Sequence, residues 1–132
     1  MYCLDTNIII DYLRGEENTK IKLEKLFDLN LEVTTTTIAL CEIYRRIFTL
    51  KDCEEELDLF ERFIKNFNLI SITKGAAITF GRLSSYLKKK GRTTEEIDLI
   101  IASIAIANNQ ILITKNRKHF ENIPDLKLEV WS

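Results

Sequence analysis

Residues 2–15 of the chain read YCLDTNIIIDYLRG, and they contain the transition that decides the fold. The short apolar run YCLD (2–5) predicts a buried strand, and the residues that follow have the spacing of a helix that ends at Gly15. Asp5 therefore lies at the carboxyl end of the first strand. In that position it either caps the following helix or belongs to a site.

The same alternation of short strand and longer helix continues along the chain. Strands are expected at residues 2–5, 31–37, 69–72, 111–114 and 126–131. Apolar residues at helical spacing fill the intervals, and strands of this kind predict an α/β fold with a central, mostly parallel five-stranded sheet covered on both faces. One of the last threonines of the second strand is expected to cap the next helix. Thr93 and Glu96 have the spacing of a capping box for the helix before the fourth strand.

Length and composition favour a single globular domain over residues 1–132, with a net charge of −1. Such a balance gives no global basic field to attract nucleic acid, although a local patch can do so. Cys3, Cys41 and Cys53 lie in apolar segments without metal-ligand spacing, so we expect buried, reduced thiols in a cytoplasmic protein. No segment approaches the ~20 apolar residues of a membrane span, and no signal peptide is indicated.

Four polar residues far apart in the sequence are expected at one edge of this sheet. The functional crevice of a parallel sheet lies beyond the carboxyl ends of its strands. Asp5 ends the first strand, and Glu42 lies in the first turns of the helix that leaves the second. Asp98 lies in the first turns of the helix that precedes the fourth strand, and Asn116 follows that strand by two residues.

Each of these residues also has a simpler interpretation. Asp5 and Asn116 can cap helices, Glu42 can be a solvated helix residue, and Asp98 suits the positive end of a helix dipole. Independent caps need not share an edge, however, so the joint placement favours a cluster. Clustered carboxylates repel one another unless a cation lies between them. Oxygen ligands without paired His or Cys favour Mg²⁺ or Mn²⁺ over zinc, and bound Mg²⁺ commonly meets a phosphate.

Three stretches carry a resemblance to a known family: LDTNIIIDYLRG (4–15), TTTTIALCEIYRR (34–46) and EEIDLIIASIAIANNQILITKNRKHFENIPDLKLEVW (95–131). In this order they resemble the PIN domain, and within it the VapC-type toxin ribonucleases of prokaryotic toxin–antitoxin pairs. The resemblance implies a three-layer α/β/α sandwich and a Mg²⁺- or Mn²⁺-dependent endoribonuclease. It also implies a homodimer and a cognate VapB-type antitoxin.

The resemblance assigns roles to particular residues. Asp5, Glu42 and Asp98 become catalytic, metal-binding acids, and Asn116 takes a fourth ligand position where the family often has Asp. Some members place an acid three residues later, where this chain has His119. Thr114 and Asn7 would orient the site through hydrogen bonds. Water activated by the bound ion would attack the phosphate in line and leave a 5′-phosphate and a 3′-hydroxyl.

RNA binding has to come from local charge in a chain with so small a net charge. KKKGR (88–92) precedes the Asp98 helix, and KNRKH (115–119) surrounds Asn116. The candidate phosphate ligands are Lys90, Arg92, Lys115, Arg117 and Lys118, with Arg45 and Arg46 one helical turn beyond Glu42. Each can equally be a solvated surface cation. His119 is the only histidine, so a nuclease that uses two histidines is excluded.

Other classes of protein fit less well. A phospho-receiver domain needs an Asp at the end of the third strand, and LISITKG (69–75) has none. A haloacid-dehalogenase-type phosphatase needs a second Asp two residues after Asp5, where this chain has Asn7. Two alternatives stay open: a non-cleaving PIN-fold module that binds RNA or a partner, favoured by the neutral Asn116, and a housekeeping RNA-processing nuclease without an antitoxin.

Overall fold

The computed structural model describes residues 1–132. Strands alternate with helices along most of the chain. The elements are β1 (Tyr2–Leu4), α1 (Thr6–Leu13), α2 (Glu17–Asp28), β2 (Val33–Thr36), α3 (Thr37–Phe48), α4 (Glu54–Ile64), β3 (Asn68–Ile70), α5 (Lys74–Lys89), α6 (Glu96–Ala107), β4 (Ile111–Thr114), α7 (Arg117–Phe120) and β5 (Lys127–Val130). No helix is both long enough and apolar enough to span a membrane.

The five strands form one sheet in the order β3-β2-β1-β4-β5, and every pair is parallel. β1 lies at the centre, where Leu4 is opposite Thr35 of β2 and Ile113 of β4. The predicted five-stranded α/β sheet is therefore confirmed, and it is wholly parallel. Because all strands point the same way, the residues that follow β1, β2 and β4 gather at one edge.

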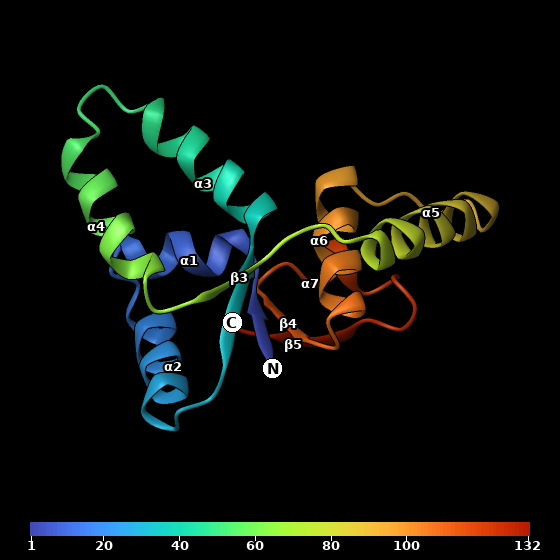
Figure 1. Cartoon of the computed structure of the whole chain (residues 1–132), viewed down its shortest axis with the longest axis horizontal. Coiled ribbons are helices and arrows are strands. Elements are labelled where there is room, and N and C mark those ends of the chain that lie inside the picture. Colours follow the sequence, from blue (N-terminus) through green and yellow to red (C-terminus); the bar gives the residue numbers. More distant parts are fainter.

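Two apolar clusters cover the two faces of the sheet. Successive side chains of a strand point to opposite faces, so Cys3 and Leu112 contact one cluster while Leu4 and Ile113 contact the other. The Leu4 side is covered by α1–α4, and the Cys3 side by α5–α7. Figure 1 shows the two sets of helices on either side of the strands. This arrangement confirms the sheet covered on both faces that the sequence pattern predicted and the three-layer α/β/α sandwich that the resemblance implied.

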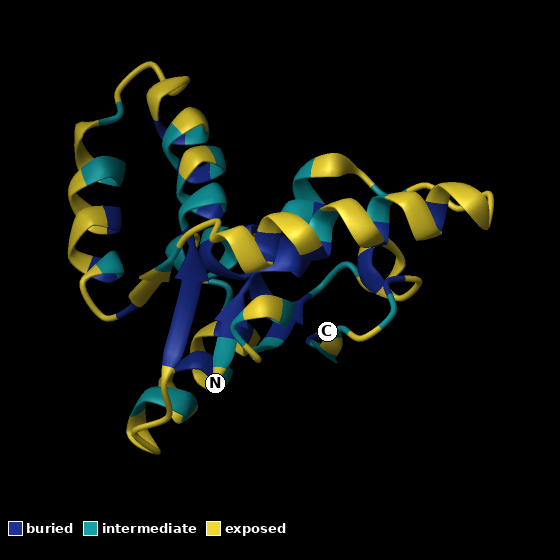
Figure 2. Cartoon of the chain, turned by 45° about the vertical axis from the view of Figure 1, so that its right-hand side comes forward, coloured by how far each residue is buried: buried dark blue, intermediate teal, exposed yellow.

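The buried second strand consists largely of threonines, whose hydroxyl groups have hydrogen-bond partners. Thr34 and Thr35 donate to the backbone carbonyls of Tyr2 and Leu4 on β1, at 3.1 and 3.0 Å. Thr36 is the N-cap of α3, as expected of a threonine at the end of this strand, and accepts from the Ala39 amide at 3.0 Å. Figure 2 shows these central strands as buried and the outward faces of the helices as exposed.

Some local expectations were wrong. Four of the five strands are shorter than predicted, and β3 is a partly exposed edge strand because only β2 flanks it. Thr93 does not cap α6: Glu96 is its first residue, Glu95 is the N-cap, and no side chain caps it. Of the three cysteines only Cys3 is buried, while Cys41 is exposed on α3. A capping box requires its acid at the third helical position, and Glu96 lies at the first.

The packing of α4 leads to a first prediction. Phe60 is completely buried, and its ring meets Tyr44 edge-on with 5.2 Å between ring centroids. Phe60→Ala leaves a cavity, so we expect the free energy of unfolding to fall by about 3–5 kcal/mol. The neighbouring Leu59 is 40% exposed, and Leu59→Ala should cost about 1 kcal/mol or less. Urea unfolding of both variants measures the difference, and equal losses would contradict this packing.

Candidate metal centre

The carboxyl edge of the sheet opens into a cleft of about 430 Å³. Only one of its lining residues is hydrophobic. They come from α1, α3, the start of α6 and the segment after β4: Asp5, Thr6, Asn7, Ile10, Glu42, Arg45, Arg46, Thr49, Glu95, Asp98, Asn116 and His119. The cleft thus brings together Asp5, Glu42, Asp98 and Asn116, which are separated by up to 111 residues in the sequence.

Asp5 lies at the bottom of this cleft and is only 3% exposed. Its Oδ1 accepts from the Thr6 amide and its Oδ2 from the Thr114 hydroxyl, both at 2.8 Å. It is also the N-cap of α1, so capping and participation in a site are combined in one residue. Burial raises the pKa of this carboxyl, with the charge of Glu42 acting in the same direction and the hydrogen bonds from Thr114 and Thr6 opposing it.

Glu42 faces Asp5 from α3 and is held by Thr6. The Thr6 hydroxyl donates to Glu42 Oε1 at 2.6 Å, which fixes one carboxylate oxygen on the cleft wall. Thr6 was not among the predicted site residues. Its position beside Asp5 was visible in the sequence, but the hydrogen bond depends on how α1 packs against α3. Asn7 also lines the cleft, and its side chain forms no hydrogen bond to the acids.

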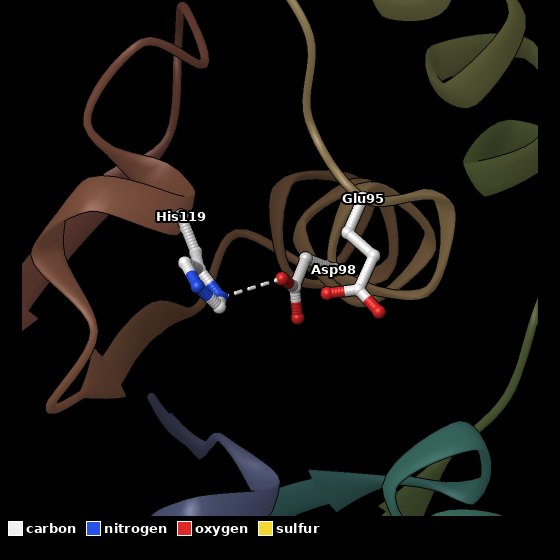
Figure 3. A group of neighbouring side chains, drawn as sticks. All are labelled: Glu95, Asp98 and His119. Atoms are coloured by element: carbon white, nitrogen blue, oxygen red, sulfur yellow. Dashed lines mark ion pairs between the residues drawn. The ribbon is translucent and has the colours of Figure 1, made fainter.

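Asp98 forms the opposite wall of the cleft with Glu95 and His119, neither of which was assigned to the metal site from the sequence. Figure 3 shows Asp98 and Glu95 at the start of α6 and His119 of α7 turned toward one another. Asp98 Oδ2 lies 2.9 Å from His119 Nδ1 but is not aligned for a hydrogen bond, and this shielded oxygen accepts none. Burial, followed by the charge of Asp5, raises the pKa of Asp98 to about 6. Glu95 could have been predicted, since it precedes Asp98 by three residues and shares its helix face.

This donor set fits a divalent cation. Burial disfavours the charged forms of Asp5 and Asp98; the charge of Glu42 adds to this effect at Asp5, and the charge of Asp5 adds to it at Asp98. A cation bound between these carboxylates removes that cost. The buried Asp98 Oδ2 without a hydrogen-bond partner is the atom that most needs such a ligand. Carboxylate and amide oxygens match Mg²⁺ or Mn²⁺. Asp5, Glu42, Asp98 and Asn116 are therefore available to hold one.

Only some of the basic residues that were predicted to bind RNA phosphates line the cleft. Arg45 and Arg46 line the cleft and form no ion pair. Lys115 is not free to bind a phosphate, because its ammonium group pairs with Asp11 at 2.6 Å and Glu16 at 2.9 Å.

The remaining candidates do not line the cleft. Lys90 lies over the Tyr86 ring at the end of α5, and Arg92 borders a separate hollow between α5 and α6. Arg117 and Lys118 are exposed on α7.

Comparison with known proteins agrees with this architecture. The family model described as PIN domain matches residues 2–126. Ribonuclease VapC2 of Rickettsia felis is 30% identical over 131 residues, which cover 99% of this chain and 98% of the relative. Ribonuclease VapC1 of Methanocaldococcus jannaschii is 32% identical over 128 residues, covering 97% and 85%.

A solved structure gives the same result at the level of the fold. The chain is similar to one in the crystal structure of VapBC2 from Rickettsia felis bound to a DNA fragment from their promoter. The TM-score is 0.92 at 31% identity, with 99% of this chain and 98% of that chain covered. The match spans both sets of helices and the whole sheet. The chain therefore belongs to the PIN-domain family, and within it to the VapC group.

Proposed function

We propose that this chain is a Mg²⁺- or Mn²⁺-dependent endoribonuclease and the toxin of a VapBC-type toxin–antitoxin pair. The observation that carries the proposal is the cleft that joins Asp5, Glu42 and Asp98, in which the buried Asp98 Oδ2 accepts no hydrogen bond. The relatives named ribonuclease VapC support cleavage of RNA as the reaction.

Asp5, Glu42, Asp98 and Asn116 would hold the cation. When bound, it would supply a nucleophile at neutral pH and stabilise the negative charge that develops on the phosphate. Thr114 fixes one oxygen of Asp5, and Thr6 fixes one oxygen of Glu42, so the acids need little rearrangement to bind. Hydrolysis of this type would leave a 5′-phosphate and a 3′-hydroxyl. A 2′,3′-cyclic phosphate among the products would contradict it.

RNA would enter along α3. Glu42, Arg45, Arg46 and Thr49 have the spacing of one helix face, and all four line the cleft. The two guanidinium groups have no carboxylate partner and lie one turn beyond Glu42, where they can bind the phosphates next to the scissile bond. Lys90, Arg92, Arg117 and Lys118 would contact RNA only farther from the acids, and Lys115 would act through its ion pairs.

The partners of the toxin are part of the same proposal. The similar Rickettsia felis structure is described as a VapBC complex, which supports a VapB-type antitoxin for this chain. We further propose a homodimer that acts in the cytoplasm. The non-cleaving module remains the second candidate because Asn116 contributes an oxygen without a charge to the fourth ligand position.

Cleavage of RNA by the purified, antitoxin-free chain tests the enzymatic proposal. We expect cleavage of a mixed pool of RNA, including individual tRNAs and structured ribosomal fragments, with Mg²⁺ or Mn²⁺ and none with EDTA. Asp98→Asn removes a cation ligand at nearly constant volume and should reduce the rate at least about 100-fold. Glu121→Gln, an exposed change outside the cleft, should leave the rate unchanged. A folded wild-type chain that cleaves no RNA would favour the non-cleaving module.

The stability of the metal-free chain is a second test. The folded-state pKa of Asp98 is about 6, above its ordinary value of 3.8, so the folded chain takes up protons before the unfolded chain does. The free energy of unfolding should therefore rise as the pH falls from 7 to 5. Glu16, whose pKa is lowered to about 2, opposes this trend only below its ordinary pKa of 4.5.

Thermal unfolding with and without Mg²⁺ measures this effect. Asp98→Asn removes the disfavoured charge and should raise the Tm of the metal-free chain. Mg²⁺ should raise the Tm of the wild type more at pH 7.5 than at pH 5.5, because protons compete for the same carboxylates. The Tm of Asp98→Asn should respond weakly to Mg²⁺. An equal response of both proteins would place the cation elsewhere.

The role of α3 is tested by RNA binding in EDTA, where no cleavage interferes. Replacing Arg45 and Arg46 together by Gln removes two phosphate contacts. The slope of log K against log salt concentration should then become less steep by about 0.7 per contact for single-stranded RNA. Arg82→Gln is the matched control, since Arg82 is an exposed arginine of α5 outside the cleft. Equal slopes for the double variant and the wild type would remove these arginines from the RNA path.

A further inference from the structure

His119 has a position that neither capping nor the proposed RNA contacts explain. It lies on α7, whose last residue, Phe120, is 1% exposed and packs in the cluster beneath α5 and α6. The His119 amide donates to the Asn116 carbonyl at 3.0 Å, which ties α7 to the segment after β4. These contacts fix the backbone on both sides of His119, and Figure 3 shows its ring facing Asp98.

The side chains of Glu95, Asp98 and His119 have the separations of ligands to one ion. One ligand atom from each residue lies within 4.8 Å of the other two. His119 Nδ1 and Asp98 Oδ2 are 2.9 Å apart. Neighbouring ligands of an octahedral ion, each about 2.1 Å from it, lie about 3.0 Å from one another. His119 and Asp98 therefore need almost no movement to share a cation.

The contact between His119 and Asp98 is an ion pair without a hydrogen bond. In an ion pair with a good hydrogen bond, the N–H of the ring points at the carboxylate oxygen. Here the two atoms are as close as in a hydrogen bond, but no hydrogen bond forms, and Asp98 Oδ2 has no other hydrogen-bond partner. A cation shared with His119 would give this oxygen the ligand that it lacks.

We propose that Glu95, Asp98 and His119 form a nitrogen-containing cation site that selects Mn²⁺ over Mg²⁺. Imidazole nitrogen is a softer ligand than carboxylate oxygen, and it favours transition metals over Mg²⁺. Glu95 is exposed and can turn toward the ion. The inference rests on the proposed function in one respect only, which is that Asp98 binds a cation.

Electron paramagnetic resonance of bound Mn²⁺ tests the proposal with a signal that is independent of catalysis. The probe is Mn²⁺ alone, added to the full chain after removal of any histidine tag. Electron spin echo modulation detects an imidazole nitrogen bound to Mn²⁺. The chain contains one histidine, so such a signal has a single source. We expect nitrogen coupling in the wild type, and this result does not depend on the folding of any variant.

Variants then test metal selectivity. His119→Gln should abolish the nitrogen signal and weaken Mn²⁺ binding about 10-fold or more, with a much smaller effect on Mg²⁺. Glu95→Gln should weaken Mn²⁺ binding and keep the nitrogen signal. Glu121→Gln changes an exposed acid outside the cleft and serves as the matched control.

The outcomes separate this inference from the proposed function. Mn²⁺ bound without nitrogen coupling, or an unchanged Mn²⁺ preference in His119→Gln, would overturn the inference and leave His119 as an ion-pair partner of Asp98. The nuclease proposal would stand in that case if wild-type cleavage still requires metal. Failure of the wild type to bind either cation would overturn both.

Discussion

The gathering of carboxylates in one cleft at the carboxyl edge of the sheet is the constraint on which the rest of the site depends. Burial raises the pKa of both Asp5 and Asp98, and a neighbouring carboxylate acts in the same direction in each case, Glu42 on Asp5 and Asp5 on Asp98. A fold that keeps these groups together without a cation gives up stability. Such a loss is typical of sites whose geometry serves binding or catalysis.

The side chains that hold the acids of the cleft in place are uncharged threonines, and the nearby Lys115 is paired with other acids. Thr6 and Thr114 donate hydroxyl hydrogen bonds to Glu42 and Asp5, so uncharged groups orient these two carboxyl groups. Outside the cleft, Lys115 joins Asp11 of α1 to Glu16, which is itself the N-cap of α2. This ion-pair group connects the segment that carries Asn116 with the helices on one face of the sheet. A cation placed there stabilises the frame and leaves the negative potential of the cleft largely intact.

The sequence predicted those features that follow from strand direction. Asp5 comes directly after β1 and Asn116 two residues after β4, and parallel strands bring such residues to one edge whatever their distance along the chain. The sequence did not predict that Lys115 forms ion pairs with Asp11 and Glu16. These two acids lie in segments that come close to β4 only when the chain is folded. The capping-box spacing of Thr93 and Glu96 was misleading because spacing alone does not say where a helix begins.

Asn116 lies where a fourth acid was expected, and the differences around it affect the types of donor atom in the site more than the total charge. Asn116 supplies an oxygen without a charge, but Glu95 adds a carboxylate on the same wall as Asp98, so the cleft still contains four acids. His119 lies three residues beyond Asn116 and adds a nitrogen donor beside Asp98. Total negative charge mainly sets how strongly a site attracts divalent cations, whereas donor type discriminates among them. Under the proposed assignment, Asn116, Glu95 and His119 together would preserve the attraction for cations and alter the preference among them.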